Sequence, residues 1–241
     1  MPGITAHAEM RPQSPCDGLP VNILIEHFSV TAQIIAWLLF ILAVAVAIWR
    51  APWYHLRETA SLNILLAMIV GIMVVWTLKA GFAPGLSIHL LGTTLLTLMF
   101  GWAFAILGII VVIGAHMLYA GSGWVELPMD ALLLGLLPAF VSFTVFRFVD
   151  THLPNNFFIY IFLVAFFGAG LAAASVVFVT SIVHITSGAY TAAEVWHDYT
   201  RYVPLVMFPE SFITGMLMTL FVAYRPEWVS TFDDSRYLKD K

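Results

Sequence analysis

A short polar stripe interrupts the segment GLSIHLLGTTLLTLMFGW, which spans residues 85–102 and is otherwise almost entirely apolar. His89 is followed by Thr93 and Thr97 at intervals of four residues, so a helix would place the three side chains on one face. Polar groups are expensive inside lipid and usually face the interior of a helix bundle. The stripe predicts that His89 binds a metal ion and that Thr93 and Thr97 continue inward as part of a transport pathway.

Among the other ionisable side chains in or beside apolar segments, four could take part in such a site. These are His184, His27, Glu26 and Glu210. Imidazole ligands suit borderline transition metals such as Ni²⁺, Co²⁺, Cu²⁺ or Zn²⁺, whereas the single cysteine cannot build a thiolate cluster. We therefore predict that one or two of His184, His27 and Glu26 join His89 as metal ligands, with Glu210 supplying negative charge deeper in the pathway. Each histidine could instead be an interface residue, and Glu210 could instead make a structural hydrogen bond.

The composition indicates a membrane protein. Of the 241 residues, 61% are hydrophobic and only 10% are charged, against about a quarter in soluble domains. The net charge of −4 comes without basic blocks, which argues against a nucleic-acid partner. The sequence has neither a phosphate-binding G-x-x-x-x-G-K-[ST] loop nor a G-x-S-x-G nucleophile motif, so we expect no enzyme activity. We also expect no tightly bound cofactor.

Seven apolar segments predict an all-α, polytopic membrane bundle, because about 20 apolar residues cross the hydrocarbon layer as a helix. The segments are 24–49, 60–79, 86–101, 102–119, 130–150, 157–183 and 202–224. Residues 86–119 would form one helix about 50 Å long, which exceeds a single crossing, so we place a break near Gly101 and Trp102. The alternative is one tilted helix with a protruding end.

The distribution of basic residues predicts the orientation in the cell inner membrane. With the N-terminus outside, seven basic residues face the cytoplasm and three face outward, as the preference of Lys and Arg for cytoplasmic loops requires. The chain is then divided into a polar tail (1–20), a transmembrane bundle (21–225) and a cytoplasmic tail (226–241). Trp76 lies near a segment end, where interfacial tryptophans are common.

Several segments resemble one membrane protein family. They are PGLSIHLLGTTLLTLMFGW, LLGLLPAFVSF, LPNNFFIYIFLVAFFGAG, EVWHDYTRYVPLVMFPESFITGM and YRPEWVSTFDDSRYL. The first contains an S-x-H-x-x-G pattern around His89, and together they cover most of the chain from about residue 60. They resemble the CbiM/NikM-type substrate-capture components of energy-coupling factor transporters for cobalt and nickel, and especially a bacterial branch of predicted permeases.

The resemblance implies a seven-helix bundle, a metal site at His89 reached from outside, and partner ATPase and transmembrane scaffold subunits. In this family a free amino terminus and a histidine at position two also hold the metal. This sequence has Pro2 at that position, so His27, His184 and Glu26 are the candidates to replace those ligands.

Two other functions are compatible with the sequence. The chain could be a structural or assembly subunit of a larger membrane complex, without transport activity of its own. It could also be a haem-binding electron carrier, with His27 and His184 as paired axial ligands.

Overall fold

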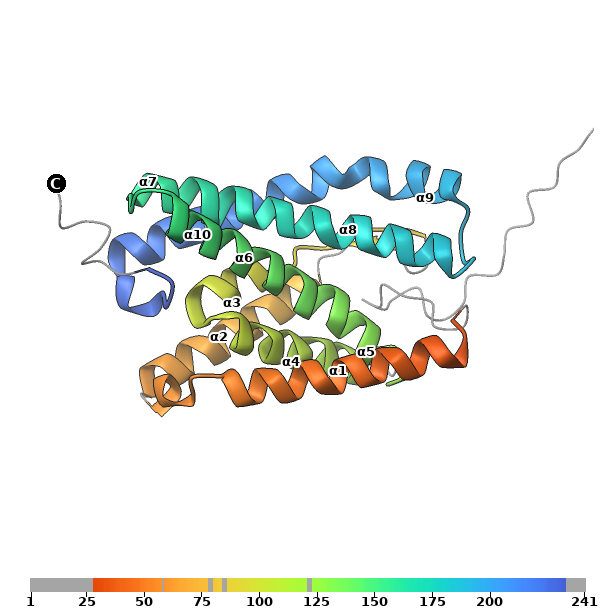
Figure 1. Cartoon of the computed structure of the whole chain (residues 1–241), viewed down its shortest axis with the longest axis horizontal. Helices are drawn as coiled ribbons and strands as arrows, with labels where there is room; N and C mark the ends of the chain where they lie inside the picture. Colours follow the sequence, from red (N-terminus) through yellow and green to blue (C-terminus); the bar gives the residue numbers. More distant parts are fainter. Residues whose placement is uncertain (1–27, 58, 78–79, 84–85, 121–122, 233–241) are drawn as a thin grey trace, which may run out of the picture.

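The computed structural model describes residues 28–57, 59–77, 80–83, 86–120 and 123–232. Within these residues, six helical stretches are long and apolar enough to cross a membrane. Helices satisfy their own backbone hydrogen bonds, which is why apolar segments adopt them in lipid. The stretches lie side by side in one bundle, as Figure 1 shows, so the predicted polytopic helical bundle is confirmed.

The first three stretches are single helices, and the last three include shorter elements. Helix α1 is Val30–Arg50, α2 is Thr59–Trp76 and α4 is Trp102–Ala120. The fourth stretch joins α5 (Leu127–Asp130), the π-helical η3 (Ala131–Leu136) and α6 (Leu137–His152). The fifth joins α7 (Phe157–Ile159), the π-helical η4 (Tyr160–Phe167) and α8 (Gly168–Thr186). The sixth contains α9 (Ala192–Asp198), η5 (Thr200–Tyr202) and α10 (Val203–Tyr224).

The segment expected as the third span, 86–101, forms only a short helix. Helix α3 runs from Thr93 to Phe100 and follows a small antiparallel hairpin of β1 (Ala80–Ala83) and β2 (Leu86–Ile88). Gly92 precedes α3 with a φ of 69°, a left-handed conformation that ends the helix in that direction. Gly101, with a φ of 85°, separates α3 from α4, and the predicted break at Gly101 is therefore confirmed.

Helix α3 lies at the centre of the bundle. All seven residues from Thr93 to Met99 are buried. The helix packs against α2, α4, α6, α8 and α10. A helix buried on all sides cannot face lipid, so α3 is an internal element, packed against helices from five of the six long stretches.

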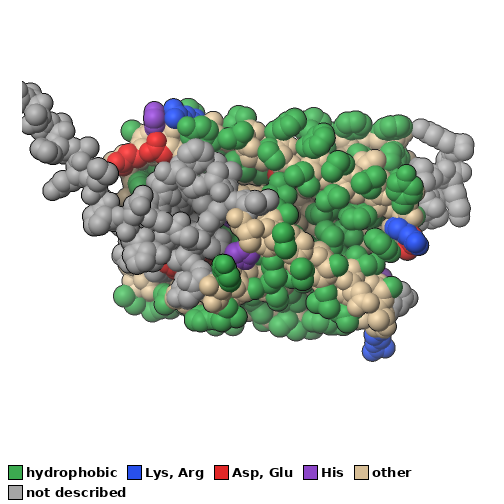
Figure 2. All heavy atoms as spheres, turned by 180° about the vertical axis from the view of Figure 1, so that it is seen from behind, with side chains coloured by type: hydrophobic (Ala, Val, Ile, Leu, Met, Phe, Trp, Pro, Cys, Tyr) green, Lys and Arg blue, Asp and Glu red, His purple; other side chains and the backbone are tan. Residues whose placement is uncertain are grey.

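The outer surface of the bundle is largely apolar. Figure 2 shows hydrophobic side chains covering one side of the molecule, with charged side chains grouped at its two ends. Helix α1 is the most exposed stretch, and it presents Ile34, Leu38, Ile41 and Leu42 to the surroundings. Such a surface is typical of a helix that contacts lipid rather than water.

The two ends of the bundle differ in their elements. The α9 end contains α9, the beginning of α1 and the end of α8. The α7 end contains α7 and the end of α1, as Figure 1 shows. A 3-10 helix, η2 (Trp53–Arg57), and another, η6 (Pro226–Trp228), also lie at the α7 end. Helix α3 begins inside the bundle and ends toward the α7 end.

Candidate metal-capture site

His89 lies inside the bundle, in the extended segment that joins β2 to α3. Its side chain is buried, and its ring packs against Trp76 with 4.4 Å between ring centroids. The expectation that His89 shares a helical stripe with Thr93 and Thr97 is therefore wrong, because the helix begins only at Thr93. The expectation that the imidazole faces the interior and not lipid agrees with its burial.

The His89 ring has a defined orientation. Its Nδ1 lies 3.4 Å from the carbonyl oxygen of Leu90. This distance is near the long limit of a hydrogen bond. A carbonyl oxygen can only accept, so the ring donates to it only in a form that carries a hydrogen on Nδ1. Metal-binding histidines commonly use this pattern, in which one ring nitrogen donates to a backbone carbonyl and the other binds the ion.

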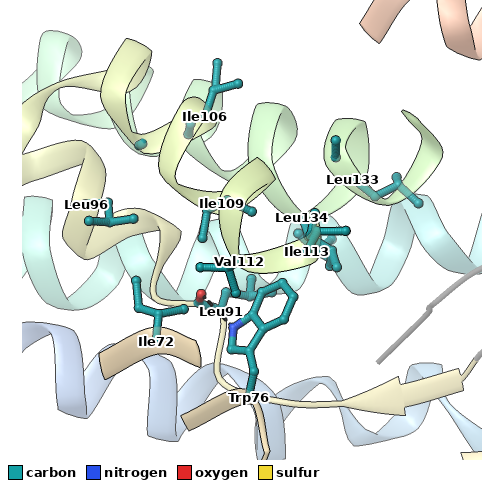
Figure 3. Packing of buried hydrophobic residues seen from close by; sticks show 14 of the residues in the cluster. Ile72, Trp76, Leu91, Leu96, Ile106, Ile109, Val112, Ile113, Leu133 and Leu134 are labelled. Atoms are coloured by element: carbon teal, nitrogen blue, oxygen red, sulfur yellow. Dashed lines mark hydrogen bonds between the residues drawn. The ribbon is translucent and has the colours of Figure 1, made fainter. Parts of the chain in front are cut away.

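Trp76 fixes the backbone just after His89. The indole Nε1 donates a hydrogen bond of 3.2 Å to the carbonyl oxygen of Leu91, and Figure 3 shows this side chain turned toward that group. Trp76 is fully buried and also lies 5.7 Å from the ring of His116. The prediction that Trp76 is an interfacial residue is wrong, because the indole packs inside the bundle rather than at a water boundary.

Glu210, from the middle of α10, contacts the same segment. Its Oε2 accepts a hydrogen bond of 2.7 Å from the amide of Leu91, and its Oε1 accepts one of 3.0 Å from the amide of Gly92. The carboxylate is buried at the N-terminal end of α3, where backbone N–H groups favour a negative charge. The structure thus gives Glu210 the structural hydrogen bonds that were one of its two expected roles.

The two threonines of the predicted pathway use their hydroxyl groups inside the protein. The Thr93 hydroxyl donates a hydrogen bond of 2.7 Å to the carbonyl oxygen of Leu134 in the π-helical η3. The Thr97 hydroxyl donates one of 2.8 Å to the carbonyl oxygen of Thr93. A π-helical segment leaves carbonyls that need other partners, and Thr93 supplies one. Both side chains are buried, and their assignment to a transport pathway stays a prediction.

His184 lies at the other histidine position of interest, near the C-terminal end of α8. Its side chain is fully buried, and its ring meets Tyr190 edge-on with 5.7 Å between centroids. Ser181, one turn earlier, donates to the carbonyl of Val177 and contacts the hydroxyl of Thr200 at 2.9 Å. Ser181 therefore joins α8 to η5 on the helix that carries His184.

The structure describes only part of the predicted ligand set. Glu26 and His27 lie outside the described residues. Among the residues that are described, no group of three or more His, Cys, Asp or Glu side chains is close enough to hold a metal ion. The metal-ligand assignments of His89, His184, His27 and Glu26 thus stay predictions.

Sequence reasoning missed Trp76 and Gly92 as parts of this site. A Cβ on Gly92 would lie 2.9 Å from Cγ1 of Ile72, in addition to requiring a left-handed backbone. The S-x-H-x-x-G spacing was the available signal, because it places a glycine three residues after the histidine. The pairing of Trp76 with Leu91 had no local signal, because the contact joins separate elements.

Comparison with known proteins assigns the chain to a family. Residues 24–228 match CbiM, described as the cobalt uptake substrate-specific transmembrane region. The chain belongs to this family. It is therefore a multi-pass membrane component of a metal uptake transporter, which confirms the resemblance and the predicted transport role. This CbiM protein was not expected to be an enzyme, and its family is one of transporter components.

A solved structure has a similar fold. It is the crystal structure of a truncated transition metal transporter, with a TM-score of 0.65 and 13% sequence identity. The alignment covers 82% of this chain and 96% of that one. At this identity the likeness concerns the fold, and it supports the helix arrangement described above. No curated protein sequence matches the chain.

Proposed function

We propose that this CbiM protein captures a divalent transition metal, Co²⁺ or Ni²⁺, from outside the cell and uses His89 as a ligand. The observation that supports this role most strongly is the imidazole of His89 itself, which is buried inside the bundle, packs against Trp76 and has its Nδ1 3.4 Å from the carbonyl oxygen of Leu90. The neighbouring backbone is held by Trp76 and Glu210, so the ring is positioned before the ion arrives.

The remaining ligands in this proposal come from His184, His27 and Glu26. A divalent ion inside an apolar bundle needs several donors, because an incompletely coordinated charge is very costly away from water. His184 is buried near the C-terminal end of α8, the end that precedes α9. Thr93 and Thr97 would line the inward continuation of the path.

The basic residues at the two ends support one orientation in this proposal. Arg50, Arg57 and Arg225 lie at the α7 end, whereas Arg201 lies between α9 and α10. Basic residues favour the cytoplasmic side of a membrane. The α9 end would then face outward, the polar tail 1–20 would be external and residues 226–241 would be cytoplasmic, in the inner membrane.

Transport against a gradient requires partner subunits in this proposal. The sequence contains no phosphate-binding G-x-x-x-x-G-K-[ST] loop. We therefore propose that an ATPase pair and a transmembrane scaffold subunit supply the energy and the conformational step. Affinity purification of the tagged protein from mild detergent tests this point, with co-purified ATPase subunits as the expected result. Co-purification of an oxidoreductase instead would favour an assembly role.

Calorimetry of the purified protein tests the capture role. We expect saturable binding of Co²⁺ or Ni²⁺ by the natural protein and a loss of at least about tenfold in affinity for His89→Ala, because an imidazole ligand is removed. His152→Ala is the matched control, since His152 is exposed and lies at the end of α6. Equal affinity for the natural protein and His89→Ala would refute the assignment of His89.

A further inference from the structure

The carboxylate of Glu210 joins two parts of the chain that are far apart in sequence. Its two acceptor oxygens each receive one backbone N–H, from Leu91 and from Gly92, which are 119 and 118 residues away. The described ion pairs of the protein, His197 with Asp198 and Arg225 with Glu227, are exposed and do not include Glu210. Its partners are thus backbone amides, so its effect on the protein is to hold a backbone in place.

Leu91 is held through both of its backbone groups. Glu210 of α10 accepts from its N–H, and Trp76 of α2 donates to its C=O. The Trp76 ring that makes this contact is also the ring that packs on His89. Gly92 adds a steric limit, because Ile72 of α2 occupies the space beside it. Two helices therefore determine the conformation of the segment that carries the imidazole.

We propose that Glu210 is a positioning residue for metal capture. It does not touch the ion in this proposal. Glu210 holds the amides of Leu91 and Gly92 and so determines the position of the His89 ring. Because Glu210 belongs to α10, the position of the ring depends on that helix. The inference rests on the proposed role of His89 as a metal ligand. Charge-assisted hydrogen bonds from buried amides are strong and directional, which suits a carboxylate to this task.

Two variants of Glu210 separate positioning from charge. Glu210→Gln keeps the size of the side chain but places an amide NH₂ where one backbone N–H needs an acceptor. Glu210→Asp keeps the charge but is one methylene shorter, so it cannot reach both amides as Glu210 does. Glu227→Gln at the α7 end is the control, because its carboxylate is exposed and pairs with Arg225. All variants are made in the full chain.

The two hydrogen bonds from the amides of Leu91 and Gly92 to Glu210 are together called the clamp. Amide hydrogen exchange tests whether the clamp forms, and it needs no metal. In the natural protein we expect the amides of Leu91 and Gly92 to exchange slowly, because both are buried hydrogen-bond donors. Glu210→Gln and Glu210→Asp should speed exchange in peptides covering residues 86–96, and Glu227→Gln should not. Unchanged exchange at these amides in both variants would overturn the clamp itself.

Cobalt binding measures whether the clamp matters for capture. Loss of a group that orients a ligand typically lowers metal affinity by about 10- to 100-fold, and we expect that loss for Glu210→Gln and Glu210→Asp. The visible absorption spectrum of saturating Co²⁺ should keep its shape, because the ligands are the same. An unchanged affinity, or a spectrum altered in both variants, would overturn the positioning role.

The same titration with His89→Ala distinguishes the two proposals. If His89→Ala loses Co²⁺ binding while both Glu210 variants bind as tightly as the natural protein, only the positioning proposal fails. If His89→Ala binds normally, the capture assignment fails, and the positioning proposal falls with it even if exchange at residues 86–96 still reports the clamp.

Discussion

The two ends of α3 are both held by distant segments, but with different chemistry. At the N-terminal end a buried carboxylate, Glu210, accepts from two amides. At the C-terminal end neutral groups make the hydrogen bonds. The Ser230 N–H donates one of 2.9 Å to the carbonyl oxygen of Met99, and the Thr231 hydroxyl donates one of 2.7 Å to the carbonyl oxygen of Leu98. Tyr160 then donates 2.7 Å to that hydroxyl.

The two ends of α3 differ in the free-energy cost of the group that holds them. Neutral hydroxyl and amide partners are enough to end a helix, as the C-terminal end shows. A buried carboxylate is costly to desolvate and is tolerated only where its hydrogen bonds are well made. Its use beside His89, and not at the other end, is consistent with a segment whose geometry serves ion capture.

Removing the carboxylate should produce the largest effect. Glu210→Ala leaves the amides of Leu91 and Gly92 buried without acceptors, and each unsatisfied group costs about 1–3 kcal/mol. We expect a clear fall in the midpoint of thermal unfolding in detergent, together with weakened Co²⁺ binding. A midpoint equal to that of the natural protein would show that water or another group replaces the carboxylate without loss.

Variants of the two glycines that flank α3 should distinguish effects on stability from effects on Co²⁺ binding. Gly92→Ala and Gly101→Ala each force a side chain into a positive-φ conformation, at a cost of about 1–3 kcal/mol. Only Gly92→Ala also meets Ile72. We expect both variants to unfold at lower temperature, and only Gly92→Ala to bind Co²⁺ more weakly in calorimetry. Equal loss of binding in both would mean that the whole helix, and not the His89 segment, determines affinity.

Changes at the C-terminal end of α3 should have the smallest effect. Thr231→Val removes the hydroxyl that joins Tyr160 to the carbonyl of Leu98, at a cost of about 1 kcal/mol. We expect a modest drop in unfolding temperature and unchanged Co²⁺ affinity. Thr144→Val is the control, because its hydroxyl bonds within its own exposed helix turn. A Co²⁺ affinity that falls with Thr231→Val would contradict the contrast between the two ends.

Much of the fold could be predicted from apolar run lengths. Each long helix satisfies its own backbone, so its existence depends on local sequence, and the Gly101 break followed from the length limit of one crossing. The start of α3 could not be predicted, because apolar periodicity continues through Leu90 and Leu91 while Gly92 adopts a left-handed conformation.

The site was predicted only in part, for a related reason. His89 could be singled out because an ionisable residue in an apolar segment is unusual. The hydrogen bonds of Glu210 and the packing of Trp76 join residues of different helices, and nothing in the local sequence of either partner reports the contact. Trp76 was assigned to the interface because tryptophans are common at the ends of membrane segments. Its packing inside the bundle overrides that tendency.

X-ray absorption spectroscopy of the Co²⁺-loaded protein tests the central claim most directly. The claim is that the His89 imidazole binds the captured ion. It predicts imidazole scattering around cobalt in the natural protein, and a shell with one imidazole fewer in His89→Ala prepared at saturating metal. The same imidazole scattering in both proteins, or a shell of oxygen ligands alone in the natural protein, would contradict it.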